Sequence, residues 1–267
     1  MLHQRVVTAS VLAAVALLGI FFLPTVAIAG VCALIGFGAG VEWAALTQQR
    51  SRGTSRWIYG SFMAAGVLLF WGFSDSTPLG VAAATLFWAI LLGWVGKLVI
   101  LKQPGRMSPH LTLGVLALAP ALGLIPYLHG IPVYGTGLLL TVLLIVWVGD
   151  IGAYFGGRRF GKSLFAPEIS PGKTWAGVWS GLVLSVLVGW GSAYSLSIPV
   201  DRPWLLWVSL VVVAIGAILA DLFESILKRS TGKKDSGSLL PGHGGVLDRI
   251  DSMLGAVPLF AGLSLLF

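Results

Sequence analysis

Long apolar runs alternate with short polar or basic segments along the whole sequence. A helix that crosses a membrane needs ~20 mostly apolar residues, and about nine such runs can be separated. They cover residues 6–23, 25–46, 57–73, 79–100, 110–128, 136–156, 175–198, 204–227 and 248–267. The pattern predicts an all-α polytopic integral membrane protein with about nine transmembrane helices. The first run is expected to be retained, because no clear small-residue cleavage site precedes a polar segment.

The composition is consistent with this fold class. Hydrophobic residues make up 57% of the 267 positions and charged residues only 10%, whereas soluble domains are about 25% charged. An ordinary water-soluble globular protein is therefore excluded. The single cysteine, Cys32, also excludes an intrachain disulfide framework and a cysteine zinc cluster.

The basic residues are distributed unevenly between the loops. Lysine and arginine total 17 against 10 acidic residues, which leaves a net charge of +7. Nearly all of these bases precede the first run or follow the second, fourth, sixth and eighth runs. Because basic loops mark the cytoplasmic side of a membrane protein, we expect the N-terminus in the cytoplasm and the C-terminus on the opposite side. This explains the charge without a nucleic-acid partner.

The chain is expected to divide into two regions. Residues 1–135 have short polar loops and only two acids, Glu42 and Asp75, and are expected to form a transmembrane scaffold of about five helices. Residues 136–267 hold the other eight acids. They are expected to form a catalytic region of about four helices with two cytoplasmic loops.

Five acids of the second region lie inside or at the ends of apolar runs: Asp150, Asp221, Glu224, Asp248 and Asp251. A carboxylate in the hydrocarbon region is costly and normally faces a cavity or a partner. Asp221 and Glu224 are three residues apart and share one helix face, as do Asp248 and Asp251. The two faces are expected to converge near the cytoplasmic surface, where carboxylates without histidine or cysteine suit a hard cation, Mg²⁺ above all.

The alternative is that these acids form structural ion pairs with Lys228, Arg229 and Arg249. We favour metal binding for the acids as a set, because intramembrane carboxylates usually serve a function. For Glu224 alone, metal binding and structural pairing are equally good explanations.

The loop between the two acidic faces combines glycines with bases. Successive amide groups in glycine-rich turns bind anions, and the GHGG run at residues 242–245 leads into the next predicted helix, whose N-terminus favours phosphate. Gly244, Gly245 and Lys234 are therefore candidates for binding phosphate groups. His243 could move a proton or donate to a phosphate, or it could simply pack in the turn.

A second loop of this kind follows the sixth run. Its SPGKT turn places Ser170, Lys173 and Thr174 just before the seventh predicted helix, which is another N-terminus suited to phosphate. An acidic metal site, basic groups and glycine-rich turns together are what phosphoryl chemistry on a polyphosphate needs.

From Ser225 to Asp251 the chain reads SILKRSTGKKDSGSLLPGHGGVLDRID. This segment resembles the C-terminal signature of the phosphatidate cytidylyltransferases (CDP-diacylglycerol synthases). The resemblance extends upstream through ADLFES, SPGKT and GDIGAYFGGRRFGK and covers about residues 136–260, while the first 135 residues match mainly in hydropathy and in Glu42-Trp43. Where many members carry an acid after the SPGKT turn, this chain has Ala176.

The resemblance implies that CTP and phosphatidic acid react to CDP-diacylglycerol and pyrophosphate in a bacterial inner (plasma) membrane, with the site facing the cytoplasm. It also implies a divalent metal, usually Mg²⁺, held at the positions of Asp221 and Asp248. The sequence leaves open whether a second, monovalent cation joins it. The expected catalytic residues are Asp221, Asp248, Lys228, Arg229, Lys234 and Arg249. The expected substrate-binding residues are Ser170, Lys173, Thr174, Ser225, Asp235, His243, Gly244 and Gly245, and the expected metal ligands are Asp221, Asp248, Asp251 and Glu224.

Other functions are compatible with parts of this pattern. The nearest is another CTP-dependent membrane lipid enzyme, such as a polyprenol or phytol kinase or a cytidylyltransferase for a non-diacyl lipid. An anion transporter would also carry intramembrane charges, although the chain lacks matched, interrupted halves. The small residues in several runs are compatible with a homodimer and equally with packing inside one chain.

Overall fold

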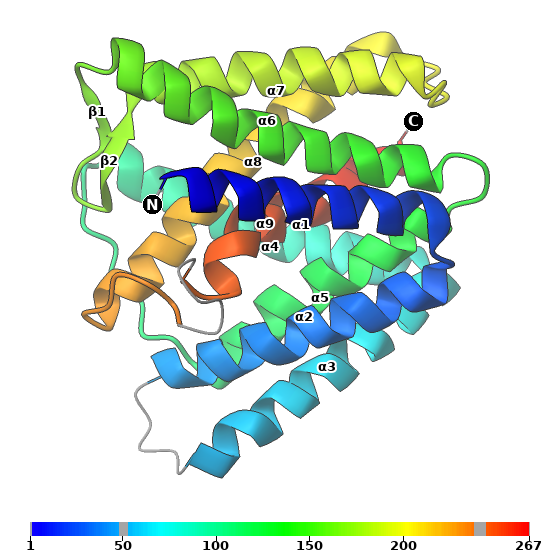
Figure 1. Cartoon of the computed structure of the whole chain (residues 1–267), viewed down its shortest axis with the longest axis horizontal. Coiled ribbons are helices and arrows are strands. Elements are labelled where there is room, and N and C mark those ends of the chain that lie inside the picture. The colour runs from blue at the N-terminus through cyan, green and yellow to red at the C-terminus, as the bar shows by residue number, and fades with distance from the viewer. Residues whose placement is uncertain (1, 48–52, 238–243, 267) are drawn as a thin grey trace.

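The computed structural model describes residues 2–47, 53–237 and 244–266 of the chain. Within these ranges it contains nine helices and one short β-hairpin (Figure 1). The helices are α1 (Leu2–Phe22), α2 (Thr25–Leu46), α3 (Gly53–Ser76), α4 (Pro78–Ile100), α5 (Leu111–Gly130), α6 (Gly135–Phe160), α7 (Trp175–Ser195), α8 (Pro203–Ser230) and α9 (Leu247–Ser264). Each predicted apolar run corresponds to one helix, with ends that differ by a few residues. The predicted all-α polytopic fold is confirmed.

The helices run back and forth between two ends of the molecule. In Figure 1, α6 and α7 lie side by side along one edge, α2 and α3 along the opposite edge, and α8 and α9 between them. The start of α1, the hairpin and the C-terminal end of α8 lie at one end, and the C-terminus of the chain lies at the other. This arrangement agrees with an odd number of crossings.

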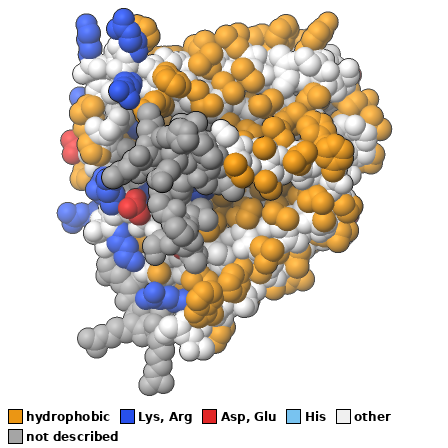
Figure 2. Space-filling model, in the orientation of Figure 1, with side chains coloured by type: hydrophobic (Ala, Val, Ile, Leu, Met, Phe, Trp, Pro, Cys, Tyr) orange, Lys and Arg blue, Asp and Glu red, His pale blue; other side chains and the backbone are white. Residues whose placement is uncertain are grey.

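The protein has the surface of an integral membrane protein. Seven helices, α2 to α8, are long and apolar enough to cross a membrane, and α1 adds a shorter described apolar stretch, Ala13–Phe22. Helix α9 begins with three charged residues, Asp248, Arg249 and Asp251. On the face drawn in Figure 2, hydrophobic side chains cover the larger part of the surface, and lysines and arginines gather at the end where the hairpin lies.

The loop after α6 forms a two-stranded antiparallel hairpin that the sequence pattern did not predict. Strand β1 (Leu164–Ala166) pairs with β2 (Ser170–Thr174), and Leu164 lies opposite Thr174. Strands this short carry too little alternation of apolar and polar residues to be recognised. At the end of β2, the Thr174 hydroxyl accepts a hydrogen bond of 3.2 Å from Gly177 N and so caps α7.

An aromatic cluster anchors α8 inside the bundle. The Phe223 ring meets Trp88 of α4 edge to face at 5.8 Å and lies 6.5 Å from Trp43 of α2. All three side chains are fully buried, and burying aromatic rings of this size is strongly stabilising. Because Glu224 directly follows Phe223, this packing also holds the next side chain of α8 in place.

Helices α6 and α7 approach closely because glycines line their contact, as in many membrane helix pairs. A Cβ atom added at Gly181 of α7 would lie 2.8 Å from the Gly149 carbonyl oxygen of α6 and 3.3 Å from Ala153 Cβ. At Gly191, further along α7, an added Cβ would meet no atom within 4 Å.

We expect Gly181→Ala to lower the free energy of unfolding by about 1–3 kcal/mol, because the methyl group must push the two helices apart. The matched control, Gly191→Ala, should be neutral or slightly stabilising because alanine favours helix. Thermal unfolding of the purified proteins in detergent measures both. Equal unfolding temperatures for the two variants would contradict the close contact.

Candidate active site

Three carboxylates meet where α8 and α9 converge. Asp221 and Glu224 come from one face of α8, and Asp251 comes from the first turns of α9. One oxygen from each lies within 4.8 Å of the others. Glu224 is 2% exposed, and its Oε1 has no hydrogen-bond partner among the described residues. We call Asp221, Glu224 and Asp251 the carboxylate triad.

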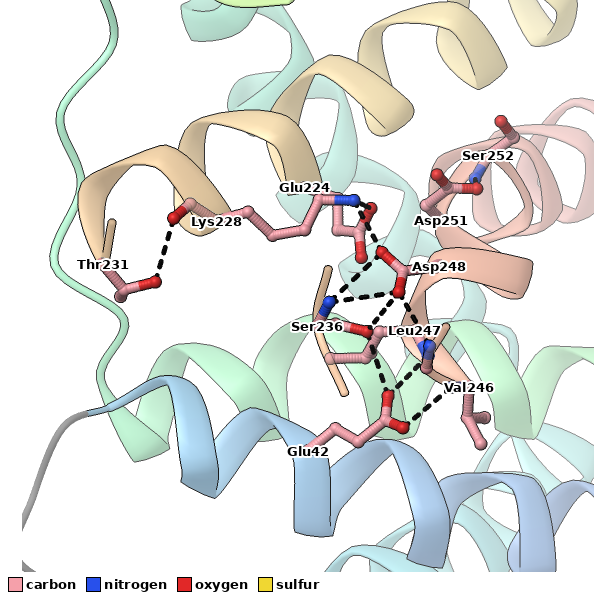
Figure 3. A network of polar contacts seen from close by, with 11 residues as sticks. Glu42, Glu224, Lys228, Thr231, Ser236, Val246, Leu247, Asp248, Asp251 and Ser252 are labelled. Carbon is pink, nitrogen blue, oxygen red and sulfur yellow. Dashed lines mark hydrogen bonds and ion pairs between the residues drawn. The ribbon is translucent and has the colours of Figure 1, made fainter. Parts of the chain in front are cut away.

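Lys228 links this triad to Asp248 (Figure 3). Its Nζ lies 2.6 Å from Glu224 Oε2, one turn back on α8, and 2.7 Å from Asp248 Oδ1 on α9. The lysine side chain is only 14% exposed, so the interaction is weakly screened by solvent. Lys228 is therefore an internal counter-ion that holds the start of α9 against the end of α8.

Asp248 also organises the loop that precedes α9. Its carboxylate accepts hydrogen bonds from the Ser236 amide (3.1 Å) and hydroxyl (3.0 Å) and from the Gly245 amide (2.8 Å). The structure thus places Asp248 beside the triad, with oxygens already engaged by Lys228 and the loop. The sequence predicted all four acids as metal ligands, and the resemblance gave Asp221 and Asp248 first. In the structure the oxygens that lie together are those of Asp221, Glu224 and Asp251.

The second predicted loop reaches the same site from the opposite side. Lys173, on β2, places its Nζ 2.6 Å from Asp221 Oδ2 and donates to the Ile218 carbonyl oxygen at 3.2 Å. The hairpin is thereby tied to α8. The acidic region therefore holds two partly buried lysines, Lys173 from the hairpin and Lys228 from the last turn of α8.

A cavity of about 490 Å³ lies between α6, α7 and α8 and reaches the triad through Asp221. Its polar lining includes Asp150, Arg158, Lys173 and Thr174, and its other walls are mainly small and aliphatic residues such as Ala214. Such a mixed lining can hold a ligand with both charged and apolar parts.

Negative charge exceeds positive charge in this region. Lys173 and Lys228 pair with Asp221, Glu224 and Asp248. Neither Asp150 nor Asp251 has an ion-pair partner within the described parts of the chain. Uncompensated carboxylates are costly inside a bundle, and an all-oxygen donor set suits a hard cation. The triad is therefore a candidate metal site.

The sequence analysis missed the role of Glu42. This side chain of α2 accepts hydrogen bonds from the amides of Val246 (2.9 Å) and Leu247 (3.0 Å) at the start of α9, and from the Ser236 hydroxyl (3.1 Å). An isolated acid inside an apolar run already indicates that Glu42 has a function or a buried partner. The sequence around it does not show which residues donate hydrogen bonds to it.

The amides of the glycine-rich turn before α9 are already occupied by internal hydrogen bonds. The sequence predicted that amide groups around Gly244 and Gly245 are free to bind phosphate. In the structure the amides of Gly245, Val246 and Leu247 already donate to Asp248 and Glu42. The start of α9 is therefore capped by internal carboxylates, and phosphate binding at these three amides would require displacing them.

The remaining predicted residues are spread over the same end of the molecule. Arg229, Lys234, Asp235 and Arg249 are exposed, Ser170 and Ser225 are half-buried, and Gly244 has a positive φ of 80°. His243 lies outside the described residues. Lys233, which was not singled out, donates to the Ala45 carbonyl oxygen at the end of α2 at 2.9 Å.

Comparison with known proteins adds independent information. The profile of the cytidylyltransferase family matches residues 3–267. A phosphatidate cytidylyltransferase of Pseudomonas aeruginosa is 37% identical over 98% of this chain and 97% of its own length. One of Haemophilus influenzae is 35% identical over 98% of both chains, and one of Brucella suis is 32% identical over 97% of this chain and 91% of its own.

We expect Lys228→Gln to lower the free energy of unfolding by about 3–5 kcal/mol, because it leaves Glu224 and Asp248 facing each other without their cation. Adding Asp248→Asn should recover part of that loss, since the repulsion is then removed. Lys162→Gln, at an exposed loop position, is the control and should be neutral. The comparison uses thermal unfolding in detergent, and a double variant no more stable than Lys228→Gln would speak against the bridge.

Proposed function

The chain belongs to the cytidylyltransferase family, and we propose that it is a phosphatidate cytidylyltransferase that makes CDP-diacylglycerol. It is a nucleotidyltransferase of phospholipid biosynthesis with CTP and phosphatidic acid as substrates. Three relatives of nearly equal length carry the name phosphatidate cytidylyltransferase. A phosphate oxygen of phosphatidate forms a bond to the α-phosphorus of CTP. The bond from that phosphorus to the oxygen bridging to the β-phosphorus breaks, and pyrophosphate leaves.

The observation that carries the assignment of the site is the triad with its unpartnered, buried Glu224 Oε1. We propose that Asp221, Glu224 and Asp251 hold Mg²⁺, because three carboxylates without nitrogen or sulfur ligands match its preference for oxygen. Asp248 supports this metal site indirectly, because Lys228 joins its carboxylate to that of Glu224. When bound, Mg²⁺ neutralises charge that develops on the transferred phosphoryl group and on pyrophosphate.

The protein's own residues have two tasks in this reaction. Lys173 and Lys228 hold Asp221, Glu224 and Asp248 in fixed positions, which pre-organises the site before substrates arrive. Lys173 and Arg158 also face the cavity, where their charges can bind substrate phosphates. Phosphatidate is largely dianionic at neutral pH because the second pKa of a phosphate monoester is about 6. A strong general base is therefore unnecessary, and alignment supplies much of the rate.

The position of the site fits a substrate that lies in the membrane. The cavity lies between three membrane-crossing helices, α6, α7 and α8, so acyl chains can approach from the bilayer while the nucleotide comes from water. We propose that the basic end of the molecule faces the cytoplasm of a bacterium, in the inner membrane, in keeping with the distribution of bases between loops.

The assay that tests the function uses purified protein in detergent with phosphatidate, Mg²⁺ and CTP labelled in the cytosine ring. We expect the label to appear in a lipid that co-migrates with CDP-diacylglycerol, with one pyrophosphate released per lipid formed. Label confined to CDP, with a phosphorylated lipid product, would instead identify a kinase. If the purified protein in detergent, where there is no ion gradient, does not consume CTP at all, the result contradicts both the cytidylyltransferase and the kinase.

We expect Glu224→Gln and Asp221→Asn each to reduce Mg²⁺-dependent turnover by at least about 100-fold, because each removes one charged ligand from the triad. Binding of Mn²⁺ to the substrate-free protein, followed by electron paramagnetic resonance, should weaken in parallel. Glu168→Gln, which removes an exposed carboxylate of the hairpin loop, is the matched control and should bind and turn over normally. Unchanged Mn²⁺ binding in both triad variants would exclude the triad as the metal site.

A further inference from the structure

Glu42 connects the N-terminal half of the chain to the proposed site. It is 3% exposed on α2, and the three groups that donate to it lie 194 to 205 residues further along the chain. The reaction proposed above assigns no role to the Glu42 carboxylate. A buried charge that is far from its partners in sequence and fully engaged needs an explanation of its own.

The contacts of Glu42 supply what the start of α9 lacks. The first amide groups of a helix have no partner within the helix, and a polar side chain at the N-cap usually accepts from one of them. The N-cap of α9 is Val246, whose side chain has no acceptor. Glu42 accepts from the Val246 amide with Oε1 and from the Leu247 amide with Oε2, so it caps α9 from a different helix.

The loop before α9 is shaped around this carboxylate. A Cβ atom added at Gly237 would lie 2.6 Å from Glu42 Cδ, and one added at Gly245 would lie 2.8 Å from the same atom. Real Cβ atoms do not approach other atoms this closely, so only glycine lets the loop close over Glu42. The hydroxyl of Ser236, which directly precedes Gly237, lies within hydrogen-bond distance of both Glu42 and Asp248.

We infer that Glu42 is a positioning residue for the reaction, which sets the place of Asp248 and Asp251 by holding the first amides of α9. Leu247 directly precedes Asp248, and Asp251 follows one helical turn later. A continuous series of contacts runs from Glu42 through Ser236, Asp248 and Lys228 to Glu224 of the triad (Figure 3). The inference rests on the proposed function, since the triad is taken as the metal site of that reaction.

The test compares Glu42→Gln, Glu42→Asp and the control Asp75→Asn. Glutamine keeps the size of the side chain but turns an NH₂ donor towards one amide of α9, which then loses its acceptor. Aspartate keeps the charge but is shorter by one methylene, so it reaches the amides less well. Asp75, exposed near the end of α3, is an acid of the same half of the chain.

We expect Glu42→Gln to weaken Mn²⁺ binding to the substrate-free protein by about 10- to 100-fold, as the loss of groups that orient metal ligands commonly does. The Mg²⁺ concentration for half-maximal rate should rise and kcat should fall, while the KM for CTP at saturating Mg²⁺ changes little. Glu42→Asp should lie between this variant and wild type, and Asp75→Asn should match wild type. A purely structural role would lower yield or unfolding temperature without moving Mn²⁺ affinity.

Ser236→Ala keeps the inference testable if Glu42→Gln does not fold. It removes only the hydroxyl shared by Glu42 and Asp248, and we expect a change in Mn²⁺ affinity in the same direction and smaller. Wild-type Mn²⁺ affinity and kcat in folded Glu42→Gln, or in Ser236→Ala where that is the variant measured, would overturn the inference. Absence of lipid product from wild-type protein would instead refute the proposed function, while the Mn²⁺ comparison would still decide the role of Glu42.

Discussion

The structure depends on the accommodation of negative charge inside an apolar helical bundle. Each carboxylate placed there must find a cation or hydrogen-bond donors, since isolated burial of a charge is prohibitively costly. Lys228 forms ion pairs with both Glu224 and Asp248, and Lys173 forms one with Asp221. Among the described residues, Glu224 Oε1 has no partner, and Asp251 accepts only from the Ser252 amide. Both lie in the carboxylate triad, where a hard cation would balance their charge.

The same constraint explains why the loops at this end are rich in glycine and lysine. Their bases are not simply spread over a cytoplasmic surface, because Lys173 extends from the hairpin to α8 and Lys233 reaches the end of α2. The amides near Gly245 are directed at Asp248 and Glu42 rather than left open. The loops therefore act first as the internal partners of the acids, and we propose that the substrates bind in the cavity between α6, α7 and α8.

The division of the chain into an N-terminal scaffold and a C-terminal catalytic region remains a prediction, and Glu42 is the contact that crosses it. Helix α2 supplies the cap that α9 lacks, and Trp43, the next residue, packs on Phe223 beside Glu224. Glu42 thus contacts α9 and Trp43 contacts α8, and these are the two helices that carry the triad. A region without chemistry of its own can in this way determine the geometry of the site.

The sequence by itself determined the helices and the family. Apolar runs of membrane-spanning length have few alternative structures because lipid satisfies no backbone hydrogen bonds, and the signature from Ser225 to Asp251 is long and specific. It also marked the acids of α8 and α9, since charges in apolar runs are conspicuous. Only the tertiary structure decided that Asp251 joins Asp221 and Glu224 while Asp248 turns to Lys228 and the loop. The reason is that residues three apart still differ by about 60° around a helix. Which of the two meets α8 depends on how α9 is rotated, and that rotation is held by Glu42, some 200 residues away in the chain.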